Sequence, residues 1–164
     1  MNALQITVPI IFVVSAIVMA FFRRLPSALV AYFGFVSAGM LGTMHITANM
    51  YVLWGIIALV DTINIYSTRL DPPQGMRLYT VTGCLVGSLL GVLGGNLAAV
   101  FCAGALGAIL GFIAFCRTPR GRLPEISMAK RLTLLMESGC TAWFTFVLAA
   151  VVLARILAPS SINL

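Results

Sequence analysis

Two acidic residues, Asp61 and Glu137, lie inside long apolar runs, where charged side chains are uncommon. Asp61 precedes Arg69 by eight residues, and Glu137 follows Arg131 by six. At the rise of an α-helix these separations are about 12 and 9 Å, so the two carboxyl groups share a depth if both runs cross a membrane as neighbouring helices. Asn64 follows Asp61 by three residues and lies near the same helix face.

An ionisable group in lipid is costly, and it is therefore a hypothesis of function. We expect Asp61, with Asn64 beside it, to bind a proton or another cation, or to hold a polar group of a substrate. The alternative is structural, namely a pair with an arginine from a helix end or a neutral acid bonded to a neighbour. For Glu137, which is closer to basic residues, a paired or snorkelling role is favoured. If the two acids approach each other, one of them holds a proton near neutral pH, because like charges repel.

The composition indicates that most of the chain is dissolved in lipid. The 164 residues are 61% apolar and 9% charged, against about 45–50% and about 25% in soluble proteins. A soluble domain of this size could not hide so much apolar surface from water. The formal net charge of +6 does not require nucleic acid, because the basic residues flank apolar runs, where they meet lipid head groups. We expect the lipid bilayer as partner and no nucleic acid.

Six apolar runs divide the chain, each close to the length of about 20 residues that crosses hydrocarbon as a helix. The runs are continuous and not alternating, which favours helices over barrel strands. The sequence therefore predicts an all-α fold, a polytopic bundle of about six transmembrane helices in a single domain, 1–164. The predicted spans are 4–22, 25–41, 50–67, 77–93, 97–116 and 132–158.

The basic residues predict the orientation. Nine of the ten fall in alternate gaps between runs, and Lys- and Arg-rich short loops stay in the cytoplasm. We expect these gaps to be cytoplasmic loops of the cytoplasmic (inner) membrane, with both termini outside the cytoplasm. The longest gap could also bind anionic lipid or a cytoplasmic partner, although an orientation signal is favoured. The nine residues are Arg23, Arg24, Arg69, Arg77, Arg117, Arg120, Arg122, Lys130 and Arg131.

Small residues recur at every fourth position in the fourth and fifth runs. Residues four apart share a helix face, and a face of glycines lets two helix backbones approach closely in lipid. Because only three residues separate the runs, we expect an antiparallel glycine-zipper hairpin. Homo-oligomerisation through the same faces is the main alternative, and a pore lined by small residues is the least favoured. The expected packing residues are Gly83, Gly87 and Gly91, then Gly104, Gly107 and Gly111, with Ala103.

The middle third of the chain resembles a family. The stretch Trp54–Asp61, with an aspartate late in an apolar helix, is followed by the glycine series Thr82–Gly91 and Ala103–Gly111. These residues are similar to the uncharacterised small bacterial membrane proteins grouped as domain of unknown function four-five-six. The resemblance covers about 100 residues, lacks the full proline-glycine turn where Leu25-Pro26 stands, and implies an all-helical membrane protein with no established activity.

No catalytic constellation is found in the sequence. It has no phosphate-binding G-x-x-x-x-G-K-[ST], no H-E-x-x-H and no G-x-S-x-G. With one histidine, four acids and four cysteines without C-x-x-C spacing, we expect no enzyme, no metal site and no cofactor. We expect a small membrane protein that transports or binds a small solute, ion or lipid. The alternative is a structural or accessory subunit that docks partner helices through its glycine faces.

Overall fold

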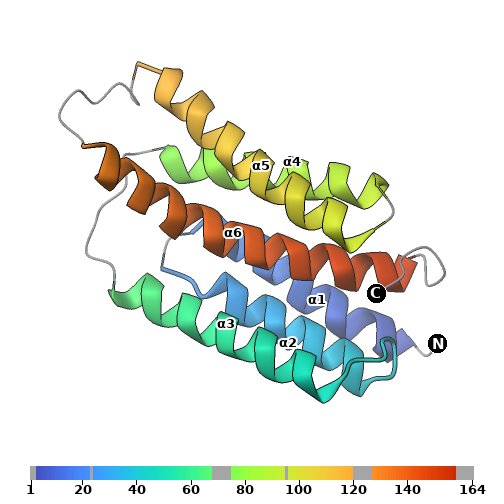
Figure 1. The fold of residues 1–164 in the computed structure, drawn as a ribbon. Coiled ribbons are helices and arrows are strands. Elements are labelled where there is room, and N and C mark those ends of the chain that lie inside the picture. Colours follow the sequence, from blue (N-terminus) through green and yellow to red (C-terminus); the bar gives the residue numbers. More distant parts are fainter. Residues whose placement is uncertain (1–2, 23, 68–74, 95, 120–126, 158–164) are drawn as a thin grey trace.

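The computed structural model describes residues 3–22, 24–67, 75–94, 96–119 and 127–157. These residues form six helices, so the predicted all-helical bundle is confirmed. The helices are α1 (Ala3–Ala20), α2 (Ser27–Met40), α3 (Ala48–Ser67), α4 (Met76–Leu93), α5 (Leu97–Arg117) and α6 (Met128–Leu157). Successive helices run in opposite directions. The beginning of α1 and the end of α6 therefore lie at the same end of the bundle (Figure 1).

Helix α6 lies at the centre of the bundle. It is placed between α4 and α5 on one side and α1, α2 and α3 on the other (Figure 1), and it contacts all five. Every residue from Phe144 to Val152 is buried. A helix that is apolar all round is typical of such a central position, whereas the surrounding helices expose large apolar side chains that would face lipid.

Helix α2 is shorter than the predicted run 25–41. It has 14 residues, whereas the other five helices are long and apolar enough to cross a membrane. Pro26 precedes its first turn, where a missing N–H costs nothing. At the other end Gly42 adopts φ 76°, and the N–H of Thr43 donates to the Ala38 carbonyl at 2.9 Å, which ends the helix.

Two helices begin two or more residues earlier than the apolar pattern predicts. Helix α6 begins at Met128 and not at residue 132, and α3 begins at Ala48 and not at residue 50. Lys130 and Arg131 therefore lie in the first turn of α6 and not in a loop. For α6 the physical reason is that charged residues end an apolar run without ending a helix, since lysine and arginine are good helix formers.

Candidate functional site

Asp61 lies where α3 crosses α6. The hydroxyl of Thr141 on α6 donates to Asp61 Oδ1 at 2.7 Å. The second carboxyl oxygen, Oδ2, is buried and has no hydrogen-bond partner among the described residues. Buried polar atoms are nearly always hydrogen-bonded, so a buried carboxyl oxygen without a partner requires an explanation. The pair Asp61–Thr141 is the centre of the candidate site.

Thr141 is also close to a second acceptor. Its Oγ1 lies 3.0 Å from the backbone carbonyl oxygen of Glu137, one helical turn earlier. The sequence predicts that Asp61 and Glu137 share a depth, and the structure joins Asp61 to the Glu137 backbone through this one hydroxyl. The Glu137 side chain is 7% exposed, so the second acid is buried in the same part of the bundle.

A line of polar residues continues along α6 from Glu137. Thr141 and Thr145 follow it at intervals of four residues, which places all three on one helix face. Thr145 donates to the Thr141 carbonyl at 2.8 Å, and its hydroxyl lies 3.1 Å from that of Ser27 on α2. All four residues are buried. The central helix thus carries a polar stripe through an otherwise apolar interior.

Arg77 lies in the first turn of α4, and its side chain is 9% exposed. Its Nε donates to the Ala20 carbonyl oxygen at 3.0 Å, at the last residue of α1. Arg77 also interacts electrostatically with the carboxyl group of Asp61. The sequence assigns Arg77 to a basic loop, whereas the structure places this cation inside the bundle, bonded to the end of α1.

The remaining predicted residues lie elsewhere or outside the described residues. Asn64 is exposed on α3, and its role beside Asp61 stays a prediction. Arg24, Arg117 and Lys130 are exposed, and Arg131 is half-buried. These four lie at the end of the bundle where α5 ends and α6 begins. The predictions for Arg23, Arg69, Arg120 and Arg122 fall outside the described residues.

Helices α4 and α5 approach each other at the predicted glycines. A Cβ atom on Gly83 would overlap the Gly107 carbonyl oxygen, one on Gly87 that of Ala103, and one on Gly111 that of Tyr79. Gly104 differs, because a Cβ there would meet Ser88 Oγ at 2.6 Å and Trp143 of α6 at 3.2 Å. The backbones are therefore too close for any side chain at Gly83, Gly87 and Gly111, whereas at Gly104 the space is filled by side chains.

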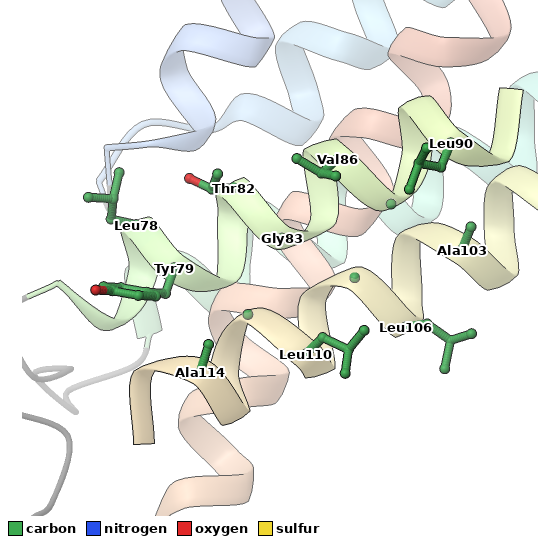
Figure 2. A pocket seen from close by; sticks show the side chains of 13 residues that line it. Leu78, Tyr79, Thr82, Gly83, Val86, Leu90, Ala103, Leu106, Leu110 and Ala114 are labelled. Atoms are coloured by element: carbon green, nitrogen blue, oxygen red, sulfur yellow. The ribbon is translucent and has the colours of Figure 1, made fainter. Parts of the chain in front are cut away.

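The same hairpin forms a groove on the surface that faces away from α6. The groove has a volume of about 690 Å³. Figure 2 shows the leucine and valine side chains of α4 and α5 that border it. Its glycine positions expose backbone, and its walls are apolar, with Thr82 and Tyr79 as the polar side chains.

Three hydroxyl residues and the burial of Arg77 are absent from the sequence-based prediction of the site. Ser27, Thr141 and Thr145 are common residue types in membrane helices, so the residue type alone does not mark them. The four-residue spacing from Glu137 to Thr141 and Thr145 is the signal that could have found two of them. In the part of the chain that the structure describes, no three His, Cys, Asp or Glu residues gather as metal ligands would.

Comparison of the chain with protein-family models, with curated proteins and with solved structures gives no match. The class that the fold supports is a multi-pass membrane protein, since five of the described helices are long and apolar enough to span a bilayer.

Proposed function

We propose that this protein binds a cation at Asp61 in the course of transporting or sensing a small solute or ion. The observation that carries the proposal is the carboxyl group of Asp61 at membrane depth, with Oδ1 bonded to Thr141 and Oδ2 buried without a hydrogen bond among the described residues. An ionised acid at membrane depth costs free energy, and it is therefore expected to have a function or a counter-charge. A bound cation supplies the interaction partner that Oδ2 lacks among the described residues.

The charges around the site support the same proposal. Asp61 and Glu137 are two acids on neighbouring helices, and Arg77 interacts electrostatically with Asp61. A cation bound at Asp61 lowers the cost of keeping its second carboxyl oxygen away from water.

Helix α3 is the element best suited to move. Only Ala58 and Ile65 are buried among its 20 residues. It contacts α2 and α6, and the Tyr32 hydroxyl donates to the Tyr51 carbonyl at 2.9 Å near its first turns. Because α3 buries little apolar surface, its displacement costs less than that of α6. Loss of the Asp61–Thr141 bond would release the half of α3 nearer its C-terminal end.

We propose that the protein lies in the cytoplasmic (inner) membrane with both termini outside the cytoplasm. The ends of α1, α3 and α5 and the beginnings of α2, α4 and α6 share one end of the bundle (Figure 1). Nine of the ten basic residues lie in the gaps that follow α1, α3 and α5 or in the helix turns that border these gaps. The preference of such residues for the cytoplasm supports this orientation.

The experiment is a comparison of two aspartate variants in lipid vesicles. Charge movement on a solid-supported membrane is recorded when pH, Na⁺ or K⁺ is stepped. The wild type and the matched control Asp71→Asn should respond to at least one step, and Asp61→Asn should not. If no step produces a response that depends on Asp61, the proposal is wrong. If Asp61→Asn does not accumulate in the membrane, the acid is structural.

A second candidate is an accessory subunit, favoured by the apolar groove between α4 and α5. The glycine faces already contact each other, which leaves less of them for a partner helix, so we prefer the first candidate. A bulky side chain in the groove, Leu110→Trp, should dissolve a complex that co-purifies from native membranes. Purification of the wild type alone would contradict this role. We propose no enzymatic activity, and the resemblance to the domain of unknown function four-five-six stays a prediction.

A further inference from the structure

We propose that the cation bound at Asp61 is a proton, and that it resides on Oδ1, which then donates to the hydroxyl of Thr141. This inference rests on the proposed function, because it names the ion that the site takes. Three features of the site support a proton: the two short distances at Thr141 Oγ1, the burial of Asp61 Oδ2 and the small number of oxygen atoms around it.

The hydroxyl of Thr141 has one proton and two neighbouring oxygen atoms. Asp61 Oδ1 lies at 2.7 Å and the Glu137 carbonyl oxygen at 3.0 Å. If Asp61 is ionised, both neighbours are acceptors, and one proton cannot make two full hydrogen bonds. If Oδ1 carries a proton, it donates to Thr141, and Thr141 donates to Glu137. Both short distances are then hydrogen bonds of ordinary length.

The second oxygen of Asp61 points to the same state. Oδ2 is buried and has no hydrogen bond among the described residues. In an ionised carboxylate this oxygen carries part of the negative charge, whose burial without a donor is costly. In a neutral acid it is a carbonyl oxygen, whose burial costs less. The geometry around both oxygen atoms therefore matches the neutral acid.

A metal ion fits the same site poorly. The hydrogen bonds bring together four oxygen atoms, the two of Asp61, the Thr141 hydroxyl and the Glu137 carbonyl. Calcium takes about 6–8 oxygen ligands, and magnesium requires near-ideal octahedral geometry. A proton requires one donor and one acceptor, which Asp61 and Thr141 supply.

The proton exchange is balanced and leaves Thr141 unchanged. On binding, an O–H bond forms at Asp61 Oδ1, with the proton taken from hydronium in the aqueous phase, which becomes water. The Thr141 hydroxyl rotates from Oδ1 to the Glu137 carbonyl. On release, the proton returns to water, and the hydroxyl turns back to the carboxylate. The acid–threonine bond thus persists in both states with its donor exchanged.

Charged and titratable groups from the neighbouring helices bear on this exchange. Arg77 of α4 attracts the ionised form, and Cys140 of α6 interacts electrostatically with Asp61. Glu137 is buried on α6. From α2 the titratable group is Tyr32, whose hydroxyl is bonded to the Tyr51 carbonyl three turns away. A pH titration of the protein must therefore resolve Asp61 from Glu137.

The titration of Asp61 can be distinguished from that of Glu137 by labelling aspartate alone, because the sequence contains two aspartates, Asp61 and Asp71. In the variant Asp71→Asn, Asp61 is the single aspartate and none of the described residues of the site is replaced. Protein with ¹³C-labelled aspartate carboxyl groups is reconstituted in lipid vesicles, and infrared spectra are recorded against pH. Isotope-shifted bands then belong to Asp61, and unlabelled Glu137 does not contribute to them.

We expect the band of a protonated carboxylic acid from Asp61 at neutral pH, which is replaced by carboxylate bands as the pH rises. Replacing Na⁺ by choline, or adding Mg²⁺, should leave the spectrum unchanged. In Thr141→Val the acid band should shift to higher frequency, because its O–H loses the acceptor. Three results would each overturn the proposal. The first is a spectrum with carboxylate bands alone at neutral pH, and the second is conversion of the acid band into carboxylate bands by Na⁺ at constant pH. The third is an acid band that does not shift in Thr141→Val.

The outcome separates this inference from the proposed function. Currents that depend on Asp61, together with a carboxylate spectrum at neutral pH, would retain cation binding and reject the proton. A protonated Asp61 in a protein that shows no Asp61-dependent current would retain the proton site and reject transport and sensing.

Discussion

The hydroxyl of Thr141 lies 2.7 Å from Oδ1 of Asp61 and joins the central helix α6 to the peripheral helix α3. The two residues are 80 positions apart in the chain. This contact connects a half-buried acid with the helix that contacts every other helix of the bundle. Most of the expected effects of substitution follow from it.

Replacement of Thr141 by valine should destabilise the protein by about 1–3 kcal/mol, because the isosteric side chain leaves Oδ1 of Asp61 buried without its partner. Unfolding in mixed detergent micelles measures the change. Thr133→Val is the matched control on the same helix, since the Thr133 hydroxyl is exposed and donates only to the Ala129 carbonyl. Equal stability of the two variants would contradict the role assigned to Thr141.

Arg77 and Asp61 should be energetically coupled. Arg77→Met removes a buried cation that interacts electrostatically with Asp61, and we expect a loss of stability in the wild-type background. In the Asp61→Asn background the loss should be smaller by about 0.5–3 kcal/mol, the range for interacting neighbours. A double-mutant cycle of unfolding free energies measures the difference. The same loss in both backgrounds would show that Arg77 does not stabilise the protein through Asp61.

Gly87→Ala should push α4 and α5 apart, because the added Cβ overlaps the carbonyl oxygen of Ala103. Overpacking of this kind costs about 1–3 kcal/mol. Gly139→Ala on α6 is the control, since its added Cβ meets its nearest atoms at 3.6 to 3.9 Å, which is ordinary contact. The control should be neutral or more stable, because alanine favours a helix by about 1 kcal/mol over glycine. If both variants unfold alike, the close approach at Gly87 is not required.

The two termini should be accessible from the same side of the membrane, opposite to the connection between α5 and α6. Fusions to a reporter that is active only outside the cytoplasm should be active at both ends. A fusion placed after Pro119 should be inactive. Activity at one terminus only would require an odd number of crossings and would overturn the proposed orientation.

The sequence was sufficient for the helices but not for the chemistry of the site. Apolar runs interrupted by basic or glycine-rich gaps mark six helices, because lipid requires long continuous helices. Asp61 is recognisable in the sequence because an acid inside such an apolar run is costly in lipid. Thr141 is not, because a threonine in a membrane helix is inexpensive when its hydroxyl bonds to the carbonyl four residues earlier. Its second bond depends on the packing of α3 against α6, which no local pattern in one sequence encodes.

Arg77 shows a further limit of the sequence. Orientation is governed by where a basic residue lies along the chain, whereas burial is governed by the helix face on which it lies. Arg77 is the first residue of the predicted run 77–93 and is counted with the loop residues, but its side chain is buried and donates to the last residue of α1. A basic residue in the first turn of a helix can therefore be assigned to a loop from the sequence and yet be buried in the bundle.

The brevity of α2 has a consequence for the surrounding bilayer. Its 14 residues cover about 21 Å at the helical rise, whereas a typical hydrocarbon core is about 30 Å thick. Lipids beside this helix must shorten or tilt, and the deformation costs a fraction of a kcal/mol for each ångström of mismatch. The protein should therefore partition into thinner regions of membrane. Lengthening the acyl chains of a reconstituted vesicle should destabilise the region around α2 first.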